Sequence, residues 1–301
     1  MAGPLSEGST VAVIGLGRMG LPMASRLAAA GYRLRGYDVS QQAREAASAL
    51  DGALIAESPS AAAAGADAVV LMLPSSSHVR SVLIDDGVLD SLAPGVALID
   101  MSSSEPLETR KLAQQAGERG VELVDAPVSG GVRGALEGTL TIMVGGSVEA
   151  VEACRPLLET IGKTVRHVGG VGAGHALKAL NNMLSAAHLL ASCEALAIGR
   201  AFGLDPNVLV ETINVSTGRS ASTERKLPEF ILTETYDAGF AMSLMVKDVG
   251  IAVALGEELG VPAGLAQRTL ALWQEAVAAL GGSVDHTAIA RWVDAAEGAS
   301  A

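Results

Sequence analysis

The chain has 301 residues, a length that predicts two domains. Its residues are 49% hydrophobic and 18% charged, which is enough apolar material for a buried core and excludes an intrinsically disordered protein. The formal net charge is -12, and no cluster of Lys and Arg interrupts it. Nucleic acids and anionic membranes are therefore poor candidates for partners.

Cysteine usage and the N-terminal sequence predict a cytoplasmic protein. Cys154 and Cys193 form neither a disulfide framework nor a metal-ligand pattern, so we expect two reduced thiols and no metal site. The first ten residues lack the basic and apolar segments of a secretory signal. The longest apolar run, Ala68–Leu73, is far shorter than the ~20 residues that span a bilayer.

The first half of the chain alternates strand and helix patterns. Short apolar or β-branched runs predict strands at Thr10–Ile14, Arg33–Tyr37, Ala68–Leu73, Val96–Ile99 and Val121–Val124. Helical patterns lie between them at Pro22–Ala30, Gln41–Leu50 and Pro106–Arg119. This alternation predicts a parallel sheet with right-handed crossovers.

The second half of the chain has helical periodicity and almost no strand signal. The predicted helices are Ala176–Phe202, one that opens at Asp205-Pro206, Met242–Leu259, Leu265–Leu280 and Thr287–Ala296. The change falls at the glycine-rich segment Val168–Gly172. We therefore expect an α/β domain over residues 1–168 and an all-α domain over residues 169–301.

The first strand runs directly into Gly15-Leu16-Gly17-Arg18-Met19-Gly20. Gly15 permits the tight turn, Gly17 lets the backbone approach a pyrophosphate, and Gly20 lets the following helix pack on the sheet. Because a strand precedes this motif and a helix follows it, all six residues are predicted to bind a dinucleotide in a Rossmann domain.

Asp38 ends the second predicted strand, 18 residues after Gly20. A carboxylate at this position can accept both ribose hydroxyls of the adenosine and repels a 2′-phosphate, so it favours NAD. Arg33, Arg35 and Arg44 lie nearby and leave NADP possible.

Two further stretches carry polar residues in positions that suit substrate binding or proton transfer. Ser129-Gly130-Gly131 offers a hydroxyl and successive unobstructed N–H groups near a strand end, which is either a nest for a substrate carboxylate or a glycine-rich connection. Lys178 and Asn182 are four residues apart and share one helix face. Lys178 is either a proton carrier among apolar neighbours or a solvated lysine, and His175, one turn earlier, is either a supporting polar group or part of the hinge.

Together these stretches resemble the β-hydroxyacid dehydrogenase family, which includes 3-hydroxyisobutyrate dehydrogenase and tartronate semialdehyde reductase. The resemblance rests on Gly15–Ala24, Asp125–Gly146, Gly172–Asn182 and Lys247-Asp248, in the family's order and spacing. It implies a Rossmann domain followed by an all-helical domain that contributes to substrate binding and oligomerisation, with the active site in the cleft between them.

The resemblance also implies roles for individual residues. It makes Lys178 the catalytic residue, with substrate contacts from Ser129, Gly130, Gly131, Asn182 and Asp248. It places Lys247 near the nicotinamide. The remaining cofactor contacts that it implies are Leu73, Pro74 and Ser103.

One departure concerns His175, which stands where dehydrogenases of small acids often carry Gln or Asn. It is similar to the 6-phosphogluconate dehydrogenases in this respect, but the continuation Met183-Leu184-Ser185 is not theirs. Only Arg133 and Arg219 are candidates to hold a phosphate. The related imine reductases generally lack a lysine at position 178.

We therefore expect an NAD-dependent enzyme that reversibly oxidises a short 3-hydroxy acid to its semialdehyde, with Lys178 carrying the proton. The alternatives are tartronate semialdehyde reductase, a threonate-type or 6-phosphogluconate-like dehydrogenase, an imine reductase and a non-catalytic NAD-binding module. Apolar faces of the C-terminal helices predict a homodimer or homotetramer.

Overall fold

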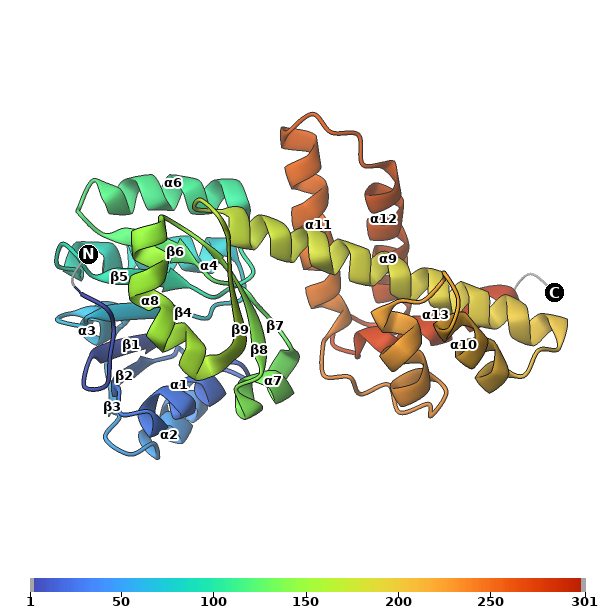
Figure 1. Ribbon diagram of the computed structural model, residues 1–301, viewed down its shortest axis with the longest axis horizontal. Helices are drawn as coiled ribbons and strands as arrows, with labels where there is room; N and C mark the ends of the chain where they lie inside the picture. Colours follow the sequence, from blue (N-terminus) through green and yellow to red (C-terminus); the bar gives the residue numbers. More distant parts are fainter. Residues whose placement is uncertain (1–2, 299–301) are drawn as a thin grey trace. The chain divides into compact units, whose positions relative to one another are not determined.

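A computed structural model describes residues 3–298 and divides the chain into two compact units, Met1–Lys178 and Ala179–Ala301 (Figure 1). The expected division after Val168 lies ten residues before this boundary. The difference arises because the first turn of helix α9 (Ala173–Phe202) is bonded to the first unit, where His175 contacts Thr109, Ser102 and Asp125.

The first unit is built on a nine-stranded sheet in the order β3-β2-β1-β4-β5-β6-β8-β7, with β9 also paired to β8. Its strands are β1 (Thr10–Ile14), β2 (Arg33–Tyr37), β3 (Leu54–Ile55), β4 (Ala68–Leu71), β5 (Ala97–Asp100), β6 (Glu122–Asp125), β7 (Val128–Ser129), β8 (Leu140–Gly145) and β9 (Gly162–Gly169). The five predicted strands all form, and β1 and β2 have the predicted bounds.

The five predicted strands are parallel, as expected, but further strands at one edge make the sheet mixed. Strands β1 to β6 are parallel, but β8 runs antiparallel to both β6 and β7. The only helix between β6 and β8 is α7 (Gly131–Glu137), whose 7 residues span about 10 Å. A parallel connection needs a crossover that returns the chain to the starting edge of the sheet, and this helix is too short to form one.

Helices cover both faces of the sheet (Figure 1). They are α1 (Gly20–Ala29), α2 (Gln41–Ser48), α3 (Pro59–Ala63), α4 (Ser76–Arg80), a π-helix (Ser81–Asp85), α5 (Val88–Ser91), α6 (Pro106–Gly117), α7 and α8 (Val148–Ile161). Strand β1 shows why two layers form: Val11 and Val13 enter the core under α1 and α8, whereas Ala12 and Ile14 enter the core under α3 and α6.

The second unit is all helical, as predicted. After α9 it contains α10 (Pro206–Asn214), a π-helix η2 (Ser222–Ile231), α11 (Met242–Glu258), α12 (Gly264–Leu280), a 3₁₀ turn (His286–Ala288) and α13 (Ile289–Gly298). Its core contains Trp273, which is fully buried and donates its ring N–H to the Ala186 carbonyl at 3.3 Å. No helix among the described residues is both long enough and apolar enough to cross a membrane.

Candidate active site

The predicted cofactor residues of the first unit follow the carboxyl ends of parallel strands. Ile14, Leu71, Asp100 and Asp125 are register partners across β1, β4, β5 and β6, so these strands end at one edge. The segments that follow them carry most of the residues expected from the sequence. Ligands bind at this edge in open α/β sheets.

The glycine-rich turn has the conformation that its sequence predicts. Gly15 has a φ of 96°, and a Cβ on it would overlap the Met72 carbonyl oxygen. A Cβ on Gly20 would overlap the carbonyl oxygen of Gly15. Gly17 differs, because nothing lies within 4 Å of the position of its Cβ. The fold therefore requires Gly15 and Gly20, whereas Gly17 leaves open space for a ligand.

Helix α1 begins without a polar side chain to satisfy its first N–H groups. Its N-cap residue Met19 makes no side-chain cap hydrogen bond, and its first turn has no acidic residue. Gly17 and Arg18, just before it, are exposed. An uncapped helix start with open space beside it suits an anionic group, so these residues fit the pyrophosphate of a dinucleotide.

Asp38 is anchored beside this turn. One carboxylate oxygen accepts the Leu16 N–H at 2.7 Å, and the other accepts the Ser40 N–H at 2.8 Å. Each oxygen retains a second acceptor site that could receive a ribose hydroxyl. Arg35 and Arg44 donate to the carbonyl oxygens of Ala64 and Asp38, so both guanidinium groups are partly engaged within the protein itself.

The loops after β4 and β5 are joined to each other. The Leu73 N–H donates to Ser102 Oγ at 2.9 Å, and Ser102 itself is buried. The expected cofactor contacts Pro74 and Ser103 are the next residues of these two loops. Ser102, which holds Leu73 in place, is not predicted from the sequence.

Ser129 lies on β7, opposite Thr141 on β8. Gly130 and Gly131 follow with φ values of 131° and 63°, conformations that residues with a Cβ rarely adopt. Both glycines are exposed, so their main-chain N–H groups are accessible. Either of the expected functions, carboxylate nest or strand connection, is compatible with this geometry.

Lys178 lies on α9 and is only 9% exposed. The interpretation as a solvated lysine is therefore wrong. Long charged side chains are rarely buried unless they have a partner or a chemical role.

A buried polar cluster fixes the start of α9. The two carboxylate oxygens of Asp125 accept the Gly172 N–H at 2.7 Å and the His175 N–H at 2.8 Å. These bonds satisfy two of the donors that a helix start leaves unpaired, and they place negative charge at the positive end of the helix dipole. The end of β6 therefore positions the helix that carries Lys178.

His175 is 1% exposed and bonded on both sides of its ring. Nε2 is 3.1 Å from the Ser102 carbonyl oxygen, Nδ1 is 2.8 Å from Thr109 Oγ1, and Thr109 in turn donates to the Glu105 carbonyl at 3.0 Å. These bonds fix the orientation of the ring and join the loop after β5 and helix α6 to the start of α9.

Two buried carboxylates flank the ring of His175. Asp100 and Asp125 lie 3.8 and 3.9 Å from it, on adjacent strands. The Asp100 carboxylate also accepts the Ser102 N–H at 3.0 Å and the Ser104 hydroxyl at 2.8 Å. His175 lies between the two carboxylates and is bonded through both ring nitrogens, so it is a structural polar group of this cluster and not merely part of a hinge.

Three of the expected residues meet in the second unit. Asn182 Nδ2 donates to Asp248 Oδ2 at 2.6 Å, and Lys247 Nζ lies 3.2 Å from Asp248 Oδ1. Asn182 is 7% and Asp248 2% exposed. The side-chain amide of Asn182 thus has a fixed orientation, because its donor side is held by a buried carboxylate and Asn181 donates to its oxygen at 3.1 Å.

The sequence analysis assigned no role to Asp125 or Thr109. The signal for Asp125 is a carboxylate at the end of an apolar strand, Leu123-Val124-Asp125, which repeats the pattern of Ile99-Asp100. Thr109 carries no such signal, because its partner is 66 residues away in the sequence.

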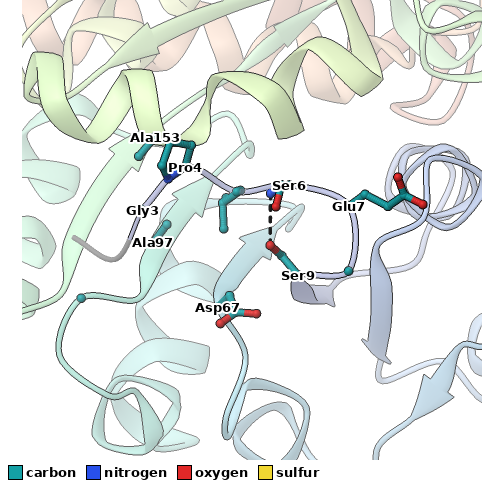
Figure 2. A pocket seen from close by; sticks show the side chains of 11 residues that line it. Gly3, Pro4, Ser6, Glu7, Ser9, Asp67, Ala97 and Ala153 are labelled. Carbon is teal, nitrogen blue, oxygen red and sulfur yellow. Dashed lines mark hydrogen bonds between the residues drawn. The ribbon is translucent and has the colours of Figure 1, made fainter.

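A pocket of about 420 Å³ lies near the opposite, amino-terminal edge of the sheet (Figure 2). Two of its polar side chains are hydrogen-bonded to the nearby main chain: Asp67 accepts the Thr10 N–H at 2.7 Å, and Ser9 Oγ accepts the Ser6 N–H at 3.1 Å. We assign no function to this pocket. The described residues also contain no group of three or more His, Cys, Asp or Glu side chains that could hold a metal ion.

Two family models cover most of the chain. The NAD binding domain of 6-phosphogluconate dehydrogenase matches residues 10–169, and the NAD-binding domain of NADP-dependent 3-hydroxyisobutyrate dehydrogenase matches residues 172–293. These models correspond to the α/β part and to the helical part that the sequence predicts.

Individual relatives agree with the family models. The chain is 42% identical to 2-(hydroxymethyl)glutarate dehydrogenase of Eubacterium barkeri, over 84% of each chain. It is 43% identical to NAD-dependent L-serine dehydrogenase of Pseudomonas aeruginosa, over 80% of this chain and 83% of the relative. A solved structure of Mycobacterium tuberculosis 3-hydroxyisobutyrate dehydrogenase with L-serine matches 95% of this chain and 99% of that chain, with a TM-score of 0.89 and 32% identity. The chain therefore belongs to the 3-hydroxyisobutyrate dehydrogenase family of NAD(P)-dependent β-hydroxyacid dehydrogenases.

Proposed function

We propose that this protein reversibly oxidises a short 3-hydroxy acid to its semialdehyde, with NAD as the hydride acceptor and Lys178 as the proton carrier. The observation that carries the proposal is the burial of Lys178 on the helix face that it shares with Asn182. A proton carrier needs this kind of protected position, whereas a lysine that serves only solubility does not.

Each expected residue has a chemical task in this reaction. When bound, NAD supplies the nicotinamide that accepts the hydride from the hydroxyl-bearing carbon. The neutral Lys178 amine takes the hydroxyl proton at Nζ, and its ammonium returns the proton in the reverse direction. Asn182 orients the substrate oxygen, because Asp248 fixes its amide. The N–H groups of Ser129–Gly131 bind the substrate carboxylate.

The named substrates of the relatives define a substrate class. 3-Hydroxyisobutyrate, L-serine and 2-(hydroxymethyl)glutarate all contain a CH₂OH group on the carbon that bears the carboxylate. They differ only in the third substituent on that carbon: a methyl, an ammonium or a carboxyethyl group. We therefore propose a 2-substituted 3-hydroxypropanoate as the substrate, and semialdehyde reduction, as in tartronate semialdehyde reductase, is the same chemistry in reverse.

A phosphorylated sugar acid is less well supported as a substrate. The two arginines considered for a phosphate both have carboxylate partners: Arg133 lies 2.7 Å from Glu137, and Arg219 lies 3.6 Å from Glu224. Binding a phosphate would compete with these ion pairs.

The test is NADH formation with a panel of hydroxy acids by wild type, Lys178→Ala, Lys178→Arg and Lys111→Ala. Lys111 is the control because it is 73% exposed and pairs with Glu108 on the surface. We expect Lys178→Ala to reduce kcat by at least 10²–10⁴-fold with NADH affinity retained. Arginine should not rescue activity, because its guanidinium stays protonated. Near-wild-type kcat in Lys178→Ala would refute the mechanism, and tight NAD binding without turnover of any acid would favour a non-catalytic module.

We also propose that the protein forms a homodimer or homotetramer. Ile198 and Phe202 on α9 are 65% and 83% exposed, and such apolar exposure is typical of interfaces. Light scattering coupled to size-exclusion chromatography measures the mass directly. A 30.4 kDa species at micromolar concentration would contradict this proposal.

The cytoplasmic location expected from the sequence stays a prediction. Several relatives carry the word mitochondrial in their names. Cell fractionation with an antibody against the chain distinguishes the two compartments.

A further inference from the structure

Lys226 is a half-buried cation on the π-helix η2 that none of the expected roles uses. Its Nζ donates to Ser185 Oγ at 2.8 Å. Lys111 and Lys247 each lie beside a carboxylate, but among the described side chains no carboxylate lies within 4 Å of Lys226 Nζ. A cation that has lost part of its hydration and has no carboxylate in direct contact is suited to bind an anionic ligand.

None of the described titratable groups around Lys226 forms a direct ion pair with it. Burial raises the pKa of the Cys193 thiol to about 12 and lowers the pKa of His286, so both groups are uncharged near pH 7. The carboxylate of Asp285 attracts the Lys226 ammonium without contacting it, and its oxygens are occupied. They accept four hydrogen bonds from Gly239, Phe240 and Thr287 and also contact His286. Burial lowers the pKa of Lys226 itself to about 8, so its ammonium is mostly charged at pH 7.

The Lys226–Ser185 pair lies next to the expected substrate residues of the second unit. Ser185 follows Asn182 by three residues on α9, so the two side chains are neighbours on one helix face with Cβ atoms about 5–6 Å apart. Lys178, Asn182 and Ser185 follow the spacing i, i+4, i+7 of one continuous stripe. The ammonium of Lys226 thus extends the polar stripe beyond the residue that orients the reacting oxygen.

We propose that Lys226 binds a second carboxylate of the substrate, and that it selects 3-hydroxypropanoates whose 2-substituent ends in an acid. This inference rests on the proposed function of Asn182 and Lys178. In a glutarate skeleton, six bonds separate the hydroxyl oxygen from the distal carboxylate oxygen, a reach of about 7–8 Å. This length exceeds the distance of about 5–6 Å between the Cβ atoms of Asn182 and Ser185, so the distal carboxylate can extend to Ser185. A methyl substituent is too short to do so.

The experiment compares kcat/KM for 2-(hydroxymethyl)glutarate and for 3-hydroxyisobutyrate. The ratio of the two values isolates Lys226, because both substrates need Lys178 and NAD. We expect the wild type to favour the diacid about 10- to 100-fold at pH 7, as for one charged hydrogen bond, and Lys226→Met to bring the ratio near 1. Arg225→Met is the matched control, since Arg225 is the adjacent residue but is 67% exposed and pairs with Glu229. It should leave the ratio unchanged.

The pH dependence gives a second readout that needs no variant. The Lys226 ammonium is lost as pH rises through about 8, so the diacid preference of the wild type should decline above pH 8. Lys226→Arg should keep the preference at high pH, because guanidinium remains charged. A merely structural lysine would change kcat for both acids alike and leave their ratio flat.

A ratio near 1 in active wild type, or a preference that survives Lys226→Met, overturns the inference without touching the proposed function. If no hydroxy acid is turned over, the proposed function fails, and glutarate binding measured by calorimetry still tests the lysine. Binding by the wild type that is lost in Lys226→Met supports the inference, and equal or absent binding overturns it.

Discussion

Replacing Asp125 by alanine should destabilise the first unit far more than an ordinary helix-cap substitution does. Asp125 is fully buried, and its loss leaves the N–H groups of Gly172 and His175 buried without an acceptor. Each buried donor that loses its partner costs about 1–3 kcal/mol, so the expected loss is about 2–6 kcal/mol. Asp125→Asn keeps one acceptor oxygen and should lose about half as much. Against a typical total of ~5–15 kcal/mol, this is a large fraction.

The control for this prediction is Asp205→Ala. Asp205 also accepts two main-chain N–H groups, those of Asn207 and Val208 at 2.9 and 3.1 Å, but it caps α10 at the surface. Water replaces an exposed cap, so we expect a loss of about 1 kcal/mol. Each variant removes two hydrogen bonds from main-chain N–H groups, and the two sites differ in whether those N–H groups are buried or exposed.

Urea unfolding followed by two signals separates the effects. Both tryptophans, Trp273 and Trp292, belong to the second unit, so their fluorescence reports on that unit, whereas far-UV circular dichroism reports on both. Asp125→Ala should lower the urea midpoint of the dichroism transition more than it lowers the midpoint of the fluorescence transition. A loss no greater than that of Asp205→Ala would show that the two buried donors find other partners, and the reasoning would be wrong.

Three further predictions concern the cofactor and substrate residues of the first unit. Asp38→Ala should lower kcat/KM for NAD more than for NADP, and a wild type that already prefers NADP would refute the assignment. Ser129→Ala should raise KM for the hydroxy acid more than KM for NAD, whereas equal changes in steady-state kinetics would indicate a structural role. Gly20→Ala should lower the free energy of unfolding, because the added Cβ overlaps the Gly15 carbonyl. Gly17→Ala should leave the free energy of unfolding unchanged but weaken NADH binding, which fluorescence measures. Equal losses of stability in the two variants would contradict this prediction.

The parallel part of the fold could be predicted because its signals are local. The run Val11–Ile14 is apolar on both faces and ends at a glycine with positive φ, so strand and turn follow from adjacent residues. The same holds for Ala68–Leu71, which is buried throughout. In these elements the local pattern and the tertiary contacts favour the same structure.

The strands at the other edge of the sheet could not be predicted in the same way. Leu140–Gly145 contains one threonine and one glycine in an otherwise apolar run. Half of the residues of Gly162–Gly169 are polar. Their pairing is set by contacts with each other, including two register shifts. The π-helix Ser222–Ile231 contains Pro228, which a sequence pattern assigns to a helix end and not to a helix interior.

In the candidate site, too, local features could be predicted from the sequence and long-range contacts could not. The glycine-rich turn is a contiguous motif, and its conformational requirements at Gly15 and Gly20 follow from the sequence alone. The partners of His175 and Lys226 do not, since each meets a side chain more than 40 residues away. No spacing rule connects such residues, so only the structure identifies the imidazole between Asp100 and Asp125 and the cation beside Ser185.

Asp125 connects the fold to the chemistry more directly than any residue that the motifs emphasise. It ends β6, pairs in register with Asp100, and accepts the first free N–H groups of α9. A helix rotates by about 100° per residue, so fixing its first turn fixes the direction in which Lys178, one turn later, projects. The carboxylate at a strand end thus sets the orientation of the proton carrier. For this reason Asp125→Asn should lower kcat as well as stability, even though both hydrogen bonds that its side chain accepts come from the main chain.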